Sequence, residues 1–282
     1  MILFIFEGTK REPRLFKTLE YLFFPKNCEH IVCSYGNNIY NLYKRMSETD
    51  FDEDIVAILM EKYREEGVGS FAGIEKRSDI SEVYLFFDYD IHNQNSTKTL
   101  ALCDLNEQLQ KMLDFFTDET EHGKLYINYP MIESIRYTKE LPDPNYCSYK
   151  IHIENCNRFK ELASEFSFYK DLDFISFRIQ KRTGTLKIPP EVQVKNIKAN
   201  WKHLVKQNSE KAYSMMEGNV LPCQKGSVHS QKSIFEAQLS GFVNNDNSIA
   251  VLNAMPLFLE DYFGCKIHKP NWVQILVALS QV

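Results

Sequence analysis

The stretch Val83-Tyr-Leu-Phe-Phe87, followed directly by Asp88-Tyr-Asp90, is the clearest strand in this sequence. Five apolar or aromatic residues in a row are typical of a strand that is buried on both faces of a parallel sheet. Ile2-Leu-Phe-Ile-Phe6 is a second run of the same kind, and it ends at Glu7-Gly8. Together the two runs predict the centre of a sheet, with acidic residues where the strands stop.

Helical patterns lie between these strands. Residues 30–34 and 124–128 are two further expected strands, and apolar residues recur at helical spacing over 13–24, 39–46, 50–66 and 102–116. Strands that alternate with helices imply a parallel sheet with crossover helices. We therefore predict an α/β fold in which a Rossmann-like module with a central parallel sheet occupies residues 1–140.

The second half of the chain carries a different pattern. We expect residues 141–282 to form a mostly helical C-terminal region, with helices at 154–169, 191–217, 230–241 and 249–263. The aromatic-rich segment from Phe235 to Phe263 is most simply core or a subunit interface, which leaves a homo-oligomer open. No long linker separates the halves, so we expect them to pack as one body.

Composition excludes several classes of protein. The 282 residues are 44% hydrophobic and 25% charged, as in globular domains, and no apolar run approaches the roughly 20 residues of a membrane span. The N-terminus lacks the features of a signal peptide, so we expect a cytoplasmic location. Seven cysteines are scattered without a C-x-x-C pair and are expected to be reduced thiols.

The net charge of -5 conceals two opposed regions. Residues 1–149 carry 16 Lys+Arg and 26 Asp+Glu, a net charge of -10, whereas residues 178–232 carry 11 and 3, a net charge of +8. Five lysines from 195 to 211 recur at spacings close to one helical stripe. Such a stripe is usually a solvated helix face, but a nucleic-acid surface is the second interpretation. The residues assigned to that surface are Arg178, Lys187, Lys195, Lys198, Lys202 and Lys206.

Acidic residues follow three of the four expected strands. Ligands of open α/β sheets bind at the carboxyl ends of the strands, and Glu7, Asp88 with Asp90, and Glu133 come directly or shortly after them. Carboxylates that converge repel one another unless a divalent cation binds, and Mg²⁺, with Mn²⁺ as a substitute, suits this ligand type. Any one of these acids alone would more often be a helix cap or turn residue.

The expected reaction is metal-assisted cleavage of a phosphodiester. Glu7, Asp88 and Asp90 are the candidate catalytic acids, and all three, with Glu133, are candidate metal ligands. Lys181 or Arg182 could supply the cation that steadies the scissile phosphate. No nucleotide-binding P-loop is present, so an ATPase, if one is required, must be a partner.

These motifs resemble the TOPRIM superfamily of topoisomerases, primases and nucleases. The resemblance covers roughly residues 1–140 and depends on Phe4-Ile-Phe-Glu7-Gly8, Ser34-Tyr-Gly36-Asn37-Asn38 and Leu85-Phe-Phe-Asp88-Tyr-Asp90. It implies that Glu7 is a metal ligand or general acid/base and that Asp88 and Asp90 bind Mg²⁺. His92 stands where the fuller family pattern has a third aspartate.

A narrower resemblance is to the TOPRIM effector subunits of the PARIS anti-phage defence system. It depends on Glu7-Gly8 with Glu12-Pro13, on Tyr129-Pro-Met-Ile-Glu133-Ser, and on the segment from Asn253 to Gly264. It implies a toxic effector that an ABC-type ATPase partner holds silent and that cleaves host RNA, with tRNA more expected than DNA, once released. The alternatives are an inactive regulatory or scaffold subunit and a DNA-nicking TOPRIM nuclease.

Overall fold

The computed structural model describes residues 1–65, 71, 74, 76–91, 100–169, 171–177, 180–182, 185–187, 189–217 and 230–268, without the side chains of 180–182, 185–187, 217, 265 and 268. Its centre is a five-stranded sheet in the order β2-β1-β3-β5-β4. The strands are β1 (Ile2–Phe6), β2 (His30–Ser34), β3 (Glu82–Asp88), β4 (Thr117–Asp118) and β5 (Gly123–Asn128). All four strands expected from the sequence are therefore present.

The sheet is mostly parallel. β2, β1, β3 and β5 run in one direction, and only the two-residue edge strand β4 is antiparallel to its neighbour. Both side chains of β4 are exposed, so it has no apolar pattern by which it could have been predicted. The α/β class is confirmed, with this antiparallel edge as a correction to the expected parallel sheet.

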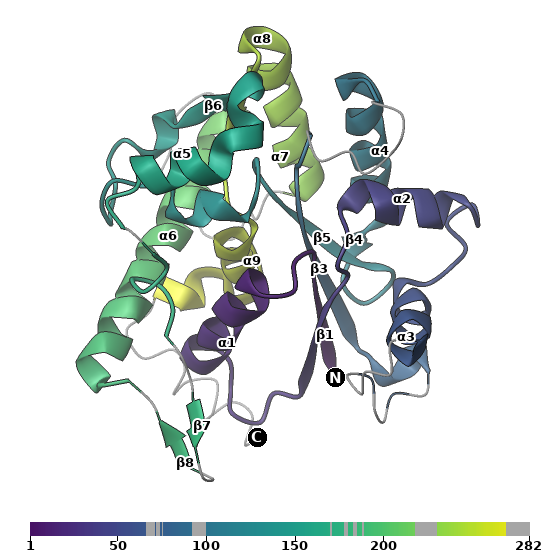
Figure 1. The fold of residues 1–282 in the computed structure, drawn as a ribbon, viewed down its shortest axis with the longest axis horizontal. Coiled ribbons are helices and arrows are strands. Elements are labelled where there is room, and N and C mark those ends of the chain that lie inside the picture. The colour runs from purple at the N-terminus through teal and green to yellow at the C-terminus, as the bar shows by residue number, and fades with distance from the viewer. Residues whose placement is uncertain are drawn as a thin grey trace.

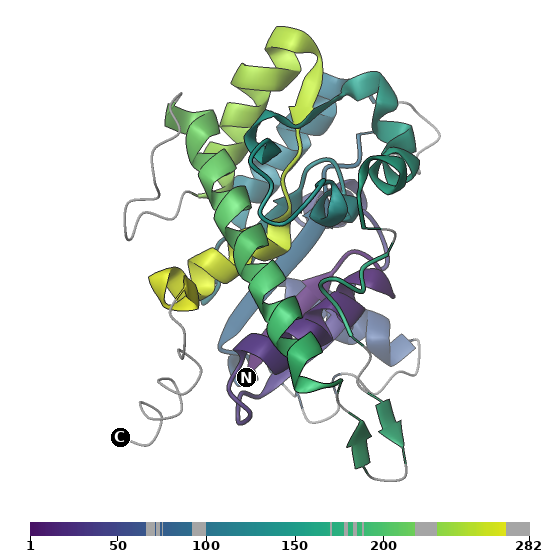
Figure 2. The ribbon, with the colours of Figure 1, turned by 90° about the vertical axis from the view of Figure 1, so that its left-hand side faces the viewer.

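Helices cover both faces of the sheet (Figures 1 and 2). On one face, Phe4 and Phe86 share a hydrophobic cluster with residues of α1 (Arg11–Phe23), α6 (Glu191–Glu217) and α9 (Ala254–Phe263). On the other, Leu85 shares a cluster with residues of α2 (Ile39–Ser47), α3 (Ile55–Glu65), α4 (Leu102–Phe115) and α7 (Gln231–Gln238). Both clusters contain residues from each half of the chain, so the two halves share one core.

The helix expected over residues 50–66 begins later in the structure than the sequence predicted. Asp50 and Phe51 have φ angles of 49° and 62°, in the left-handed region that a right-handed helix excludes. Asp54 then accepts a hydrogen bond from the amide of Val56 at 2.7 Å, and α3 begins at Ile55. The local hydrogen bond of Asp54 therefore decides where the helix starts.

The C-terminal region is mostly helical but contains two small antiparallel pairs. β9 (Ser248–Ala250) pairs with β6 (Lys150–His152), so the helix expected at 249–263 begins only at Ala254, where the Asn253 side chain accepts from the amide of Met255. β7 (Gln180–Arg182) pairs with β8 (Thr185–Lys187) in a hairpin. The remaining elements are α5 (Phe159–Phe166), α8 (Asn244–Asp246), a π-helical turn η6 (Leu239–Val243), and the 3-10 turns η2 (Arg77–Asp79), η3 (Ile132–Arg136), η4 (Tyr146–Ser148), η5 (Ile153–Arg158) and η7 (Gly264–His268). Of the helices in these ranges, none is both long and apolar enough to cross a bilayer.

Candidate functional site

The C-terminal ends of β1, β3 and β5 meet at one edge of the sheet. The amide of Glu7 donates to the carbonyl of Phe86 at 3.0 Å, and the amide of Tyr89 donates to the carbonyl of Asn128 at 2.9 Å. These bonds continue the parallel pairing one residue beyond the strands. We call this part of the molecule, with the side chains of Glu7, Glu12, Asp88 and Asn128, the carboxylate edge.

Glu7 and Asp88 are in direct contact there. The backbone amide of Asp88 donates to Oε2 of Glu7 at 3.0 Å. Oδ1 of Asp88 in turn accepts from Nδ2 of Asn128 at 2.8 Å. The structure thus brings together two acids from strands that are 81 residues apart in sequence, and Asn128 orients one of them.

Glu12 is a third carboxyl group at this edge, and it is not among the candidate acids expected from the sequence. It is 5% exposed, and its Oε1 accepts from the amide of Gly8 at 3.0 Å. Only a glycine leaves room for this contact, since a Cβ on residue 8 would lie 2.6 and 2.7 Å from the two carboxylate oxygens of Glu12. The signal that could have found Glu12 is an acid one helical turn beyond Glu7-Gly8, at the start of α1.

Glu133 is also buried near this edge, but it has a cation of its own. Its side chain forms an ion pair with Arg11, the first residue of α1. Glu133 nevertheless contributes negative charge that raises the pKa of Glu12 and Asp88. Glu133, a candidate metal ligand, is therefore already paired with a cation, and Arg11 places a guanidinium at this edge.

Burial makes ionisation of these acids unfavourable. It raises the pKa of Glu7 to about 8, with the negative charges of Asp90 and Glu12 adding to the effect. Burial and the charge of Glu7 likewise raise the pKa of Asp88 well above its usual range, and burial raises that of Glu12. A divalent cation would offset the cost of holding these groups ionised together.

The fit to Mg²⁺ rests on two carboxylates. Within the described ranges, no three Asp, Glu, His or Cys side chains are placed to hold one metal ion. Mg²⁺ is commonly bound through one or two carboxylates, with waters and substrate phosphates completing its shell, and Glu7 and Asp88 would be the two carboxylates here. Asp90 is half-buried, and its charge reaches Glu7 and the phenol of Tyr40. His92, at the third position of the motif, lies outside the described residues.

Tyr40 is a further group that the sequence did not single out. Its hydroxyl is buried and has no hydrogen-bond partner among the described residues. Burial raises its pKa well above the usual value, and the charges of Tyr89, Asp90 and Glu7 add to this. The hydroxyl is therefore a neutral donor close to the acids.

A cavity of about 330 Å³ adjoins this edge on the β2 side. It is lined by Tyr35, Gly36 and Asn37 after β2 and by Lys62 of α3, among others. The amide of Gly36 donates to the carbonyl of Glu7 at 2.9 Å, and Lys62 donates to the carbonyl of Tyr35. The segment after β2 that lines this cavity is thus hydrogen-bonded to the backbone of the catalytic candidate Glu7.

The lysines of α6 do not form one uniform surface. Lys195 is exposed and pairs with Glu191 at 2.8 Å, and Lys206 lies 3.8 Å from Glu210. Lys198 is partly buried, 5.6 Å from the centre of the Phe23 ring, and burial and Lys202 lower its pKa. Phe23 ends α1, about 18 Å along the helix from Arg11, so Lys198 is far from the carboxylate edge.

The other basic candidates lie mostly outside the described side chains. Arg178 is not described, and the side chains of Lys181, Arg182 and Lys187 are not described although their backbone forms β7 and β8. Figures 1 and 2 place this hairpin toward the start of β1, at the end of the sheet opposite Glu7. Arg11 is a described cation at the carboxylate edge, where it pairs with Glu133 and its charge lowers the pKa of Glu12.

Lys211, the fifth lysine of the stripe, is inside the protein. It is 1% exposed and donates to the carbonyls of Tyr146, at 3.2 Å, and Tyr149. Burial lowers its pKa to about 7. The expectation of a solvent-facing lysine is therefore wrong at this position, because the helix turns this residue toward η4.

Replacing Lys211 with Met tests this burial. In wild type the unfolded chain keeps the Lys211 proton to about pH 10.5, whereas the folded protein releases it near pH 7. The unfolded state binds more protons in between, so this group makes stability rise with pH from 7 to 10.5. We expect the free energy of unfolding of wild type minus that of Lys211→Met to increase between pH 6 and pH 10 in urea titrations. The exposed Lys195→Met should show no such trend, and parallel curves for both variants would contradict the assignment.

Gly8→Ala tests the close approach of Glu12. The added Cβ forces the Glu12 carboxylate away from the amide of residue 8, and the loss of that bond should lower the free energy of unfolding by about 1–2 kcal/mol. Gly241→Ala is the matched control, because a Cβ there meets nothing within 4 Å. An equal loss in the two variants would refute a specific role for Gly8.

In comparisons with known proteins, no protein-family model, curated protein or solved structure matches this chain. The class that fold and site define is therefore an α/β protein with buried carboxyl groups at the C-terminal edge of its sheet. Its function is inferred from this geometry and from the sequence motifs.

Proposed function

We propose that this protein is a Mg²⁺-dependent endonuclease with a TOPRIM-like catalytic module. The single observation that carries the proposal is the hydrogen bond from the backbone amide of Asp88 to the Glu7 carboxylate, which brings two acids of raised pKa together at the end of a parallel sheet. Glu7 and Asp88 hold the ion, and Asp90 remains a third candidate ligand. Mn²⁺ replaces Mg²⁺ in this scheme, because both accept oxygen ligands.

The ion, when bound, stabilises negative charge on the phosphodiester undergoing cleavage. Asn128 orients Asp88 through its side-chain amide, and Gly8 holds Glu12 beside Glu7. Arg11 offers a guanidinium at the same edge, which suits a substrate phosphate. Burial raises the pKa of Glu7 toward the neutral range, which suits proton transfer, and Glu7 is the candidate general acid/base.

RNA is the proposed substrate, with tRNA favoured over DNA. The narrower resemblance to PARIS effectors supports this choice, and it also supports a toxic role in anti-phage defence under the control of an ABC-type ATPase partner. The net charge of +8 over residues 178–232 supports contact with a polyanion away from the carboxylate edge.

A cleavage assay on the purified chain tests the proposal. Total tRNA and supercoiled plasmid DNA are incubated separately with Mg²⁺, with Mn²⁺ and with EDTA. We expect tRNA fragments with either metal and none with EDTA. Nicked plasmid with intact tRNA would favour a DNA-nicking enzyme, and cleavage that persists in EDTA would refute metal dependence.

A non-catalytic subunit is the second candidate. It is favoured by the ion pair of Glu133 with Arg11 and by the lack, among the described residues, of a three-ligand metal cluster. On this alternative the chain binds the ATPase as a regulatory or scaffold subunit. It predicts no cleavage in any of these reactions, together with a stable complex with the ATPase.

A further inference from the structure

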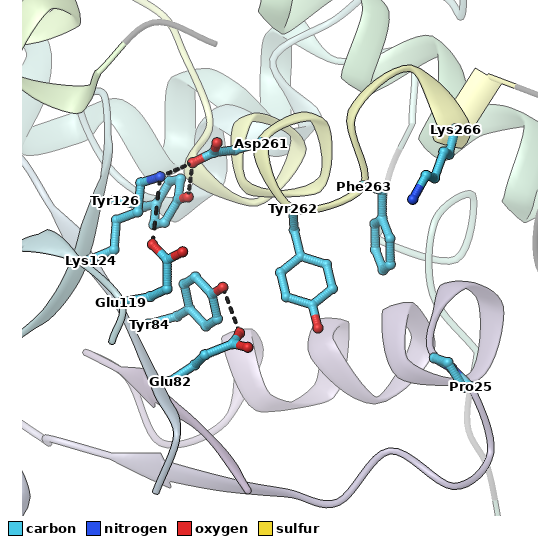
Figure 3. Close-up of a pocket in the computed structure, with 10 residues that line it drawn as sticks. All are labelled: Pro25, Glu82, Tyr84, Glu119, Lys124, Tyr126, Asp261, Tyr262, Phe263 and Lys266. Atoms are coloured by element: carbon cyan, nitrogen blue, oxygen red, sulfur yellow. Dashed lines mark hydrogen bonds and ion pairs between the residues drawn. The ribbon is translucent and has the colours of Figure 1, made fainter. Parts of the chain in front are cut away.

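A second cavity lies at the opposite end of the sheet from the carboxylate edge. It has a volume of about 360 Å³, and its walls come from the first residues of β3 and β5 and from the last turn of α9 (Figure 3). Glu82 and Tyr84 belong to β3, Lys124 to β5, and Asp261 and Tyr262 to α9. The proposed nuclease does not use any of these residues.

The charged side chains of this cavity are not balanced. Lys124 is shared between two acids, with Nζ at 2.5 Å from Asp261 and 3.8 Å from Glu119. Glu82 accepts only the hydroxyl of Tyr84, at 2.8 Å, and no positively charged group in the described part of the chain forms an ion pair with it. Lys266 is the other cation of the lining, and Figure 3 shows it on the far side, next to Phe263. Among the described residues, Glu82 is thus a carboxylate without a cation in an ion pair.

The acids of this cavity already bind one ammonium group, because the Nζ of Lys124 lies between Asp261 and Glu119. The negative potential extends to its tyrosines. Burial is the largest cause of the raised pKa of Tyr262, and the negative charge of Glu82 is the second. Burial also raises the pKa of Tyr84, and the hydrogen bond to Glu82 and the charge of Glu82 raise it further. A cation that enters near Glu82 would lower the energy of this arrangement.

Aromatic rings supply the rest of the wall. The rings of Tyr84 and Tyr262 are 5.8 Å apart and inclined at 77°, and Figure 3 shows the Tyr262 side chain pointing into the space between α9 and α1. Phe263 follows it along the wall. Ring faces attract cations and pack against apolar groups, so the lining suits a ligand with both.

We propose that this cavity binds a small organic ammonium ion with an apolar body. The ammonium group contacts Glu82 and the apolar body lies against Tyr262 and Phe263. Lys266 at the far side disfavours a second positive charge, which selects a monocation over a polyamine. This binding is independent of the proposed cleavage reaction.

Calorimetric titration of the full chain with phenethylammonium tests the proposal. The matched ligand control is 2-phenylethanol, which has a similar shape and no charge. We expect phenethylammonium to bind with one site per chain and 2-phenylethanol to bind at least about tenfold more weakly. Equal affinity for the two ligands, or no binding of phenethylammonium, would overturn the proposal even if no variant could be made.

Binding measurements on variants test whether the ligand occupies this cavity. Glu82→Gln keeps an acceptor for Tyr84 and removes the charge, and it should weaken phenethylammonium about tenfold or more; Tyr262→Leu should also weaken it. Glu121→Gln, an exposed residue of the β4–β5 turn, and Asp88→Asn should bind as wild type does. If Asp88→Asn lost binding while Glu82→Gln kept it, the cation would occupy the carboxylate edge and this site would be wrong.

Discussion

Asp88→Asn is expected to reduce Mg²⁺-dependent cleavage of tRNA by about 100-fold or more. The substitution removes one of two carboxylates proposed to hold the ion, and a bound metal supplies several kcal/mol of transition-state stabilisation. Glu7→Gln should have an effect of similar size, because Glu7 is the other carboxylate proposed to hold the ion. Initial rates at saturating Mg²⁺ are the measurement.

Stability separates this loss from unfolding. Burial and repulsion raise the pKa of Asp88, so a neutral Asn should leave the metal-free protein as stable as wild type or more so. Mg²⁺ should raise the Tm of wild type and have a smaller effect on Asp88→Asn. Asp52→Asn, at an exposed turn, is the matched control and should cleave at the wild-type rate. Full activity of Asp88→Asn would refute the catalytic assignment.

Phe258→Ala is expected to lower the free energy of unfolding by about 3–5 kcal/mol. Phe258 of α9 is fully buried, and its ring lies 5.0 to 5.7 Å from the rings of four sheet residues. Those four are Phe4, Tyr84, Phe86 and Tyr126. Its removal leaves a cavity directly on the centre of the sheet, and urea denaturation measures the loss.

Phe168→Ala provides the comparison, because Phe168 is 78% exposed. It should change stability by no more than about 0.5 kcal/mol. A small effect at both positions would mean that α9 is not part of the cooperative unit formed by the sheet. A large effect at Phe258 alone supports one unit that includes both halves of the chain.

The strands and the acids after them could be predicted because their signals are local. Continuous apolar runs such as Ile2 to Phe6 specify buried strands, and the rule that ligands bind at strand ends directs attention to Glu7 and Asp88. The same rule, applied to every polar residue, would also have found Asn128 at the end of β5. The helix of residues 191–217 was predicted correctly because its apolar residues recur over many turns.

Other features depend on contacts distant in sequence. Lys211 belongs to a lysine stripe by spacing, yet it is buried because α6 packs on η4. Residues 249 and 250 were expected to begin a helix over 249–263, yet with Ser248 they pair with Lys150–His152 as a strand. A pattern of apolar residues records which positions are buried, and it does not record which partner buries them.

The sequence by itself determined that this chain has a parallel sheet with acids at the C-terminal ends of its strands, because both properties are local to each strand. Only the tertiary structure decided which groups meet at that edge, and it added Glu12, Arg11 and Asn128 to Glu7 and Asp88. It also decided that the C-terminal half covers the sheet through α7 and α9. The physical reason is that burial and electrostatic coupling depend on distance in space, which chain order does not specify.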